Sequence, residues 1–436
     1  MRLCQRKGSV LHCAIHDADL APTVAQRIWS PITYFVLASC LHCACITFLY
    51  ACFYSLLCLF CACIVLASCL HALDTPLILT IIGVTGRYAQ LYRHMEMSDL
   101  VMGLDIGYSS IKMAFGSGGQ PAMRLMSSAA APLSRFNMLS DGSGGRNLGG
   151  GFEVLVKGEP WVGGADADAI SNYAQALHSN YITSPQYLAL FYAALTATNV
   201  DRIARLVIGL PVSHYRDPEK VAQLTKLLTG AHTINAHKTV TVDHVKVVPQ
   251  PMGAYMEFVA SVPSRTDGFK VNKDTTVLVV DPGHFSFDWC AFRNGYKPDS
   301  SGSTSSSGAK ILEKTSEILQ TKDGKVVDMV KLTNAVRDRR TTIWAGASAL
   351  DYTQAMNEAI KDVMETNITE LQNSLRIISA QSGVDVLVLA GGAYAWCESA
   401  LMEAWPDALF YRAASPIESN ARGFWMLGKH EQSKAK

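Results

Sequence analysis

Two short stretches of the chain place an aspartate at the end of an apolar run, with a glycine two residues later. Asp105 follows LVMGL and precedes IGYSS, while Asp281 follows TVLVV and precedes PGHFSFD. A turn that contains glycine or serine exposes backbone N–H groups, which bind phosphate oxygens. A carboxylate beside such a turn holds Mg²⁺ mostly through water, because Mg²⁺ dehydrates reluctantly. The two stretches therefore predict a pair of phosphate-binding turns, with Mg²⁺ near Asp105 and Asp281.

Two polar side chains near these turns add to the predicted chemistry. Lys112 follows seven residues after Asp105 and supplies a point charge for phosphate. Gln250 lies in VVPQPMG, at a predicted strand-to-helix junction, where a neutral amide can orient an attacking water without being a base. Each feature alone has a plainer reading, because Asp and Gly are common turn residues and Gln250 could simply begin a helix.

A pair of glycines late in the chain is the third feature. Gly391 and Gly392 stand between two alanines, directly after the apolar run VDVLVL. Glycines there let a planar base approach the backbone, and the alternative is a turn that needs a positive φ. The sequence contains no Walker A pattern, no zinc-protease HExxH and no nucleophile elbow.

Alternating strands and helices must position these residues. Leu100–Phe115 reads as strand, turn and strand, residues 152–162 as a hairpin, and residues 140–151 and 299–308 as polar loops. The apolar patterns predict further strands at 203–210, 240–248, 276–281 and 384–389, and helices at 185–198, 218–228, 251–258, 309–319, 327–337, 349–379 and from about 418. The strand–turn–strand opening occurs twice, 176 residues apart, which predicts an α/β protein with two similar halves and a cleft between them.

The order of the motifs resembles that of the actin-like ATPase superfamily. DIGYSSIK, PQPMGAYMEF, VVDPGHFSFDW, LAGGAYAW and NARGFWMLG are similar to its first phosphate, first connecting, second phosphate, adenosine and second connecting motifs. VIGLPVSHYRDP, the SSGS loop and NARGFW resemble the ParM/StbA plasmid segregation family, and within it the branch called PRTRC system protein D. The resemblance covers about Leu100–Leu427.

This resemblance implies an actin-like ATPase fold, with two RNase H-like α/β domains around a nucleotide cleft. Domain I would comprise residues 98–258 plus 417–436, and domain II residues 259–416. By position, Asp105 and Asp281 match the acids that organise Mg²⁺ and act in catalysis, and Gln250 matches the residue that orients water. The matched nucleotide-contacting positions are Gly107, Ser109, Ser110, Lys112, Gly283, His284, Gly391, Gly392 and Ala393. Two departures are His284, where ParM has a second glycine, and Pro282, which lacks an N–H donor.

The implied function is hydrolysis of ATP with Mg²⁺, coupled to filaments that segregate plasmid DNA. The implied partners are further copies of the chain and a DNA-bound adaptor protein. With 38 basic against 37 acidic residues, the overall charge supports no direct binding of DNA. Two alternatives remain open, a sugar-kinase-like phosphotransferase on the same fold and a membrane-anchored structural protein.

Residues 1–97 differ in composition from the rest of the chain. Ten of the twelve cysteines lie between Cys4 and Cys69, and residues 28–73 contain no Asp, Glu, Lys or Arg. One interpretation is a two-span membrane hairpin, since a run of about 20 apolar residues spans a bilayer. The other is a mis-assigned start, because VLASCLH occurs twice in this low-complexity region. The expected location is the cytoplasm, with a membrane tether only if residues 28–73 are real.

Overall fold

The structure is a computed structural model that describes residues 100–138, 145–171 and 181–435. The chain divides into two compact units, residues 1–91 and 92–436, and every described residue belongs to the second. The predicted membrane hairpin, the cysteine-rich segment and the question of the start therefore lie outside the described residues. Among the helices that are described, none has both the length and the apolar character needed to cross a bilayer.

The first sheet has six strands in the order β3-β2-β1-β7-β9-β8. They are β1 (Val101–Ile106), β2 (Ser110–Gly116), β3 (Ala122–Ser127), β7 (Arg202–Leu210), β8 (Gly230–Asn235) and β9 (Lys238–Pro249). β1 runs antiparallel to β2 and parallel to β7, and every residue of β1 is buried. A strand covered on both faces reads as a continuous apolar run, which is why the sequence located β1.

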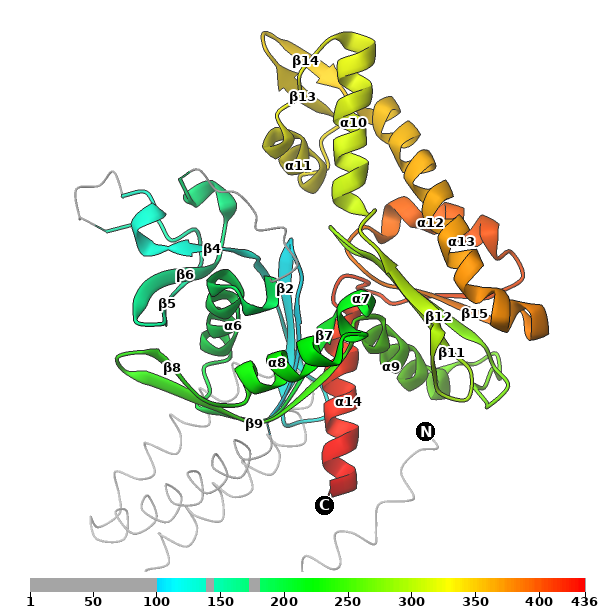
Figure 1. The fold of residues 1–436 in the computed structure, drawn as a ribbon, viewed down its shortest axis with the longest axis horizontal. Helices are drawn as coiled ribbons and strands as arrows, with labels where there is room; N and C mark the ends of the chain where they lie inside the picture. The colour runs from blue at the N-terminus through cyan, green and yellow to red at the C-terminus, as the bar shows by residue number, and fades with distance from the viewer. Residues whose placement is uncertain (1–99, 139–144, 172–180, 436) are drawn as a thin grey trace, which may run out of the picture. The chain divides into compact units, whose positions relative to one another are not determined.

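The second sheet repeats the topology of the first over five strands, in the order β12-β11-β10-β15-β16. They are β10 (Val277–Pro282), β11 (Phe287–Phe292), β12 (Tyr296–Thr304), β15 (Val386–Leu389) and β16 (Leu409–Arg412). β10 is antiparallel to β11 and parallel to β15, as β1 is to β2 and β7. The prediction of two similar halves is confirmed, and each half opens with a central hairpin (Figure 1).

Helices accompany both sheets. They are α6 (Pro185–Thr198), α7 (Val212–Tyr215), α8 (Pro218–Leu228), α9 (Pro251–Ser261), α10 (Gly308–Asp323), α11 (Met329–Arg337), α12 (Thr353–Ser382), α13 (Tyr394–Ala404) and α14 (Ser419–Ala435). The predicted bounds of α6 and α8 are those of the structure. The start of α6 follows from local chemistry, because the Ser184 side chain accepts a hydrogen bond from the N–H of Tyr187 and Pro185 takes the first helical position.

Two smaller sheets complete the described part of the chain. One contains β4 (Ala129–Pro132), β6 (Glu159–Ala165) and β5 (Phe152–Val156), and α6 packs against all three strands. The other is the hairpin of β13 (Thr342–Ala345) and β14 (Ser348–Asp351), which lies beside α10 and α11 (Figure 1). Short 3₁₀ turns are η1 (Leu133–Arg135), η2 (Ala167–Ala169), η3 (Tyr181–Thr183) and η4 (Val262–Ser264).

The C-terminal helix α14 returns to the first sheet and packs on β1, β2, β7 and α9. Glycines allow backbones to touch at this contact. A Cβ atom on Gly103 would lie 2.2 Å from the carbonyl oxygen of Ala421, and one on Gly253 would lie 2.3 Å from that of Asn420. The last helix is therefore part of the layer that supports β1, which places Asn420 beneath both central hairpins.

Two sequence predictions are wrong in their details. Residues 299–308 were expected to form a loop, but β12 continues to Thr304, because Ser300 and Ser301 are buried against β11 and Gly302 admits the Trp289 ring. The helix expected from 349 begins at Thr353, since residues 348–351 pair with β13. The sequence patterns also missed β3, β4, β8, β13, β14, β16, α7 and α13.

Candidate functional site

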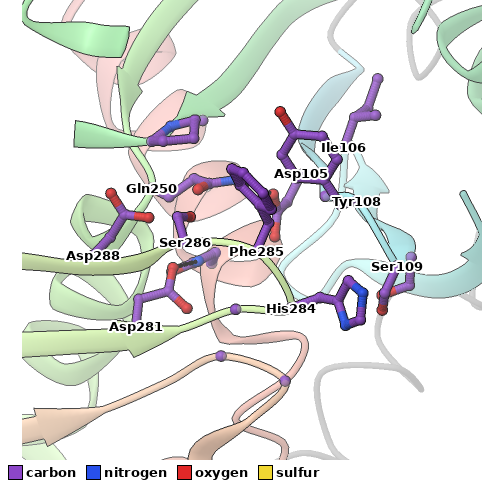
Figure 2. Close-up of a pocket in the computed structure, with 18 of the residues that line it drawn as sticks. Asp105, Ile106, Tyr108, Ser109, Gln250, Asp281, His284, Phe285, Ser286 and Asp288 are labelled. Carbon is purple, nitrogen blue, oxygen red and sulfur yellow. Dashed lines mark hydrogen bonds between the residues drawn. The ribbon is translucent and has the colours of Figure 1, made fainter. Parts of the chain in front are cut away.

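A pocket opens where the turns of the two central hairpins meet Gln250, the residue directly before α9. Its lining includes every site residue predicted from the sequence except Ala393. Figure 2 shows Asp105 on one side, Asp281 on the other and Gln250 between them, with the His284 ring beside Ser109. The fold therefore brings residues from four distant parts of the chain to one place.

The two hairpin turns have the same backbone geometry. The N–H of Gly107 donates to the carbonyl of Ser110 at 3.1 Å, and the N–H of Gly283 donates to that of Ser286 at 2.8 Å. We call Gly107–Ser110 the first turn and Gly283–Ser286 the second turn. Within the described residues, the N–H groups of Ser109, His284 and Phe285 donate to no other group. Both turns thus offer backbone donors of the kind that bind phosphate oxygens.

Asp105 holds two of the predicted side chains in place. Its Oδ2 accepts from the Lys112 Nζ at 3.1 Å, and its Oδ1 accepts from the Gln250 Nε2 at 2.9 Å. The carboxylate is buried, with 3% of its surface exposed, so both contacts act at low dielectric. No described residue donates to the Oε1 of Gln250. The amide is therefore oriented by its nitrogen, and its oxygen remains available to accept from water.

Asp281 and Asp288 form a pair of carboxylates, which lie side by side in the register of β10 and β11. The Nδ2 of Asn420 donates to the Oδ2 of Asp281 at 2.6 Å, and the N–H of Val212 donates to the Oδ1 of Asp288 at 2.7 Å. Burial, followed by the charges of Asp105 and Asp288, raises the pKa of Asp281 to about 7. Burial raises the pKa of Asp288 to about 6. The pocket therefore favours a proton or a cation at these carboxylates.

The chemistry of the carboxylates fits a hydrated divalent cation. The Oδ2 of Asp288 is buried and has no hydrogen-bond partner of normal geometry among the described residues. In the described part of the chain, no three His, Cys, Asp or Glu side chains lie close enough to enclose a metal ion. This pattern does not fit zinc or calcium, which take most of their ligands from the protein. It fits Mg²⁺, which keeps several waters and takes one or two carboxylates.

The glycine pair lies against the second turn. Gly391 has a φ of +83°, and a Cβ atom there would lie 2.5 Å from the Oδ1 of Asp281. The alternative reading of Gly391, a turn that needs positive φ, therefore holds. Gly392 is exposed at the pocket, with no atom within 4 Å of where a Cβ would be. Ala393 is buried, donates its N–H to the carbonyl of Pro282 at 2.9 Å and does not line the pocket.

The pocket residues that were not assigned a role from the sequence include Tyr108, Phe285, Asp288 and Asn420. A signal existed for Asp288, because it follows Asp281 by seven residues, as Lys112 follows Asp105. Asn420 belongs to the NARGFW motif, but its contact with Asp281 joins residues 139 positions apart. Local spacing does not reveal such a contact.

Comparison with known proteins shows which proteins this chain is similar to. Residues 103–253 match the family described as actin-like proteins, N-terminal domain. The archaeal actin homologue Ta0583 superposes with a TM-score of 0.60 at 16% identity, covering 76% of this chain and 99% of its own. Its complex with ADP superposes with a TM-score of 0.57 at 17% identity and the same coverage.

A further similar structure is the 15-stranded ParM filament from Clostridium botulinum, with a TM-score of 0.58 and 16% identity over 76% of this chain and 99% of that one. A comparison with curated proteins finds no match. The chain therefore has the actin-like fold, and residues 103–253 within it match the N-terminal domain of actin-like proteins.

Proposed function

We propose that the protein is an actin-like ATPase, which binds and hydrolyses ATP with Mg²⁺ and forms nucleotide-dependent filaments that segregate plasmid DNA. The observation that carries the proposal is the matched pair of turns. Both offer backbone N–H groups to one pocket, each stands beside a buried aspartate, and Gln250 lies between them. Two turns with a purely structural role would not require donors, buried aspartates and Gln250 to meet at one pocket.

Each side chain has a role in this proposal. The first and second turns bind the phosphates from opposite sides through backbone N–H groups, and Lys112 adds positive charge to the first. Gln250, oriented by Asp105, accepts a hydrogen bond from the attacking water and positions it for in-line attack. The exposed Gly392 gives the adenosine room to approach the backbone.

Asp105, Asp281 and Asp288 are the residues that would hold Mg²⁺, mostly through its waters. When bound, the ion neutralises negative charge that develops on the phosphates. The carboxylates are buried and close together, so a bound cation would relieve their mutual repulsion. Asn420 keeps the Asp281 carboxylate in a fixed orientation.

Assembly into filaments is supported by the comparison structures, one of which is a ParM filament. Identical subunits that contact each other through two different faces propagate rather than close. The proposed division into domain I, residues 98–258 plus 417–436, and domain II, residues 259–416, gives each domain one of the two sheets. A DNA-bound adaptor protein would link such a filament to the plasmid.

The test of the enzymatic part is phosphate release by the purified full-length protein, with Mg²⁺ and with EDTA. Asp281→Ala should slow turnover at least about 100-fold, because it removes charge that organises the metal. Asp407→Ala is the matched control, since Asp407 is exposed and does not line the pocket. Equal rates for wild type and Asp281→Ala would contradict the assignment.

The test of assembly is sedimentation with ATP, with ADP and without nucleotide. We expect pelleting with ATP only. Phosphate transfer from ATP to added sugars, with no pelleting under any condition, would instead favour the phosphotransferase alternative.

A further inference from the structure

Aromatic side chains occupy the tips of both turns and touch each other. Tyr108 belongs to the first turn and Phe285 to the second, and their ring centroids lie 4.9 Å apart with planes inclined by 48°. This separation is within the range of attractive aromatic pairs. The two rings belong to hairpins of different sheets, so their contact connects the two halves of the actin-like fold at the pocket.

Tyr108 is supported from behind, and this support fixes where its ring lies. Tyr181 of η3 stacks on it, with centroids 4.7 Å apart and an angle of 22°. Tyr187 of α6 packs edge-on against Tyr181 at 5.4 Å. Tyr181 and Tyr187 are buried, with 6% and 2% of their surface exposed. Tyr108 is therefore the last ring of a packed row formed by Tyr187, Tyr181 and Tyr108. Phe285, from the second turn, contacts that last ring.

The ring contact lies inside the pocket that contains Asp105, Gln250 and Asp281. Figure 2 shows Phe285 between Gln250 and the first turn. The backbone N–H groups that would bind phosphate lie in the same two turns as the rings. Separation of the two turns would release phosphates held by both, and it would also break the contact between Tyr108 and Phe285.

We propose that Tyr108 and Phe285 form an aromatic clasp, which holds the two turns together around bound phosphates and sets the rate of nucleotide release. The proposal rests on the proposed function, because it requires a nucleotide between the turns. Neither ring carries charge to bind phosphate, so their contribution is to resist opening and to exclude water. Exclusion of water also strengthens the hydrogen bonds that the turns make to phosphate.

The test is the release of ADP carrying a fluorescent N-methylanthraniloyl group, chased with excess ATP, from the full-length protein. Tyr108→Ala and Phe285→Ala should each release it about 10-fold faster, which corresponds to about 1.4 kcal/mol. The double variant should release labelled ADP at about the same rate as each single variant, because all three lack the same contact. Phe285→Leu, which keeps an apolar side chain of similar reach, should lie between wild type and Phe285→Ala.

Tyr255→Ala provides the control. It removes a stacked pair of comparable size, Tyr255 on Phe292 at 3.8 Å, from residues that do not line the pocket, and release should stay at the wild-type rate. Unchanged release in both single variants, or additive acceleration in the double variant, overturns the clasp. A wild-type protein that binds no labelled nucleotide overturns the proposed function itself. Circular dichroism of each variant shows whether it is folded. If an alanine variant is unfolded, the release rate of Phe285→Leu tests the clasp in its place.

Discussion

At the scale of single residues, Asp105 and Asp281 occupy equivalent positions but have different neighbours. Asp105 faces Lys112 in the register of its hairpin, so its negative charge is paired. Asp281 faces Asp288, and in the described part of the chain neither of these buried carboxylates forms an ion pair with a cationic side chain. In the proposed function, Asp105 both orients Gln250 and faces the metal, whereas the unpaired charges of Asp281 and Asp288 would attract the metal most strongly.

This carboxylate pair should make stability depend on pH in the absence of Mg²⁺ and nucleotide. Burial raises the pKa of Asp281 from 3.8 to about 7, so the folded protein holds a proton that the unfolded chain releases. The free energy of unfolding should then fall as pH rises from about 4 to 7, by roughly 2–4 kcal/mol. Urea denaturation in EDTA between pH 5 and 8 measures the effect.

Asp281→Asn should reduce this dependence, because the amide does not titrate and only Asp288 of the pair still does. Asp407→Asn should leave it unchanged, since Asp407 is exposed. A slope that is the same in wild type and Asp281→Asn would show that Asp281 is ionised in the folded protein across this range.

At the scale of elements, the contact between α9 and α14 determines how the two connecting motifs support the site. Gly253 and Gly423 lie where the helices cross, and a Cβ atom on Gly423 would lie 1.7 Å from the carbonyl oxygen of Gly253. The contact is therefore between backbones. Asn420 of α14 lies at this contact. Its Oδ1 accepts a hydrogen bond from the N–H of Ala254, and its Nδ2 donates to Asp281.

Gly423→Ala should destabilise the protein by about 3 kcal/mol, because the added methyl group has no space and the helices must move apart. The gain in helix propensity from Gly to Ala, about 1 kcal/mol, is too small to compensate. Urea denaturation measures the change, with Gly118→Ala as the control, since a Cβ there would meet no atom within 4 Å. A Gly423→Ala variant as stable as wild type would show that the crossing can relax.

At the scale of the whole molecule, the nucleotide that the proposed function places between the two turns would couple its binding to the relative position of the two sheets. A ligand shifts such an equilibrium only by its differential affinity for the two states. ATP, which reaches both turns with its terminal phosphate, should favour the state with the turns together. If that state has the better self-association surface, ATP favours the filament.

Gln250→Ala should leave assembly intact and prolong the lifetime of filaments several-fold, because loss of the terminal phosphate is delayed. Light scattering followed over time after addition of a limiting amount of ATP measures both properties. Equal decay in wild type and variant would show that Gln250 does not time disassembly. If neither protein scatters light with ATP or with a non-hydrolysable analogue, the filament part of the proposal fails and a monomeric ATPase remains.

The sequence by itself determined the elements that carry the site. The apolar runs before Asp105 and Asp281 predicted β1 and β10, and the glycine in each turn predicted where those strands end. These signals are local, because burial on both faces requires a continuous apolar run and a tight turn requires particular residues. The same logic failed at residues 300–302, where serine and glycine form a buried part of β12 because Trp289 of β11 supplies the large side chain.

Only the tertiary structure decided which residues meet. The bond from Asn420 to Asp281 and the ring contact of Tyr108 with Phe285 depend on how α14 and the two hairpins pack. Residues more than a hundred positions apart are brought together by the summed packing of whole sheets and helices, and no local periodicity encodes that sum. For this reason the positions of the two turns could be predicted from the sequence, whereas the pKa of Asp281 and the contact between Tyr108 and Phe285 could not.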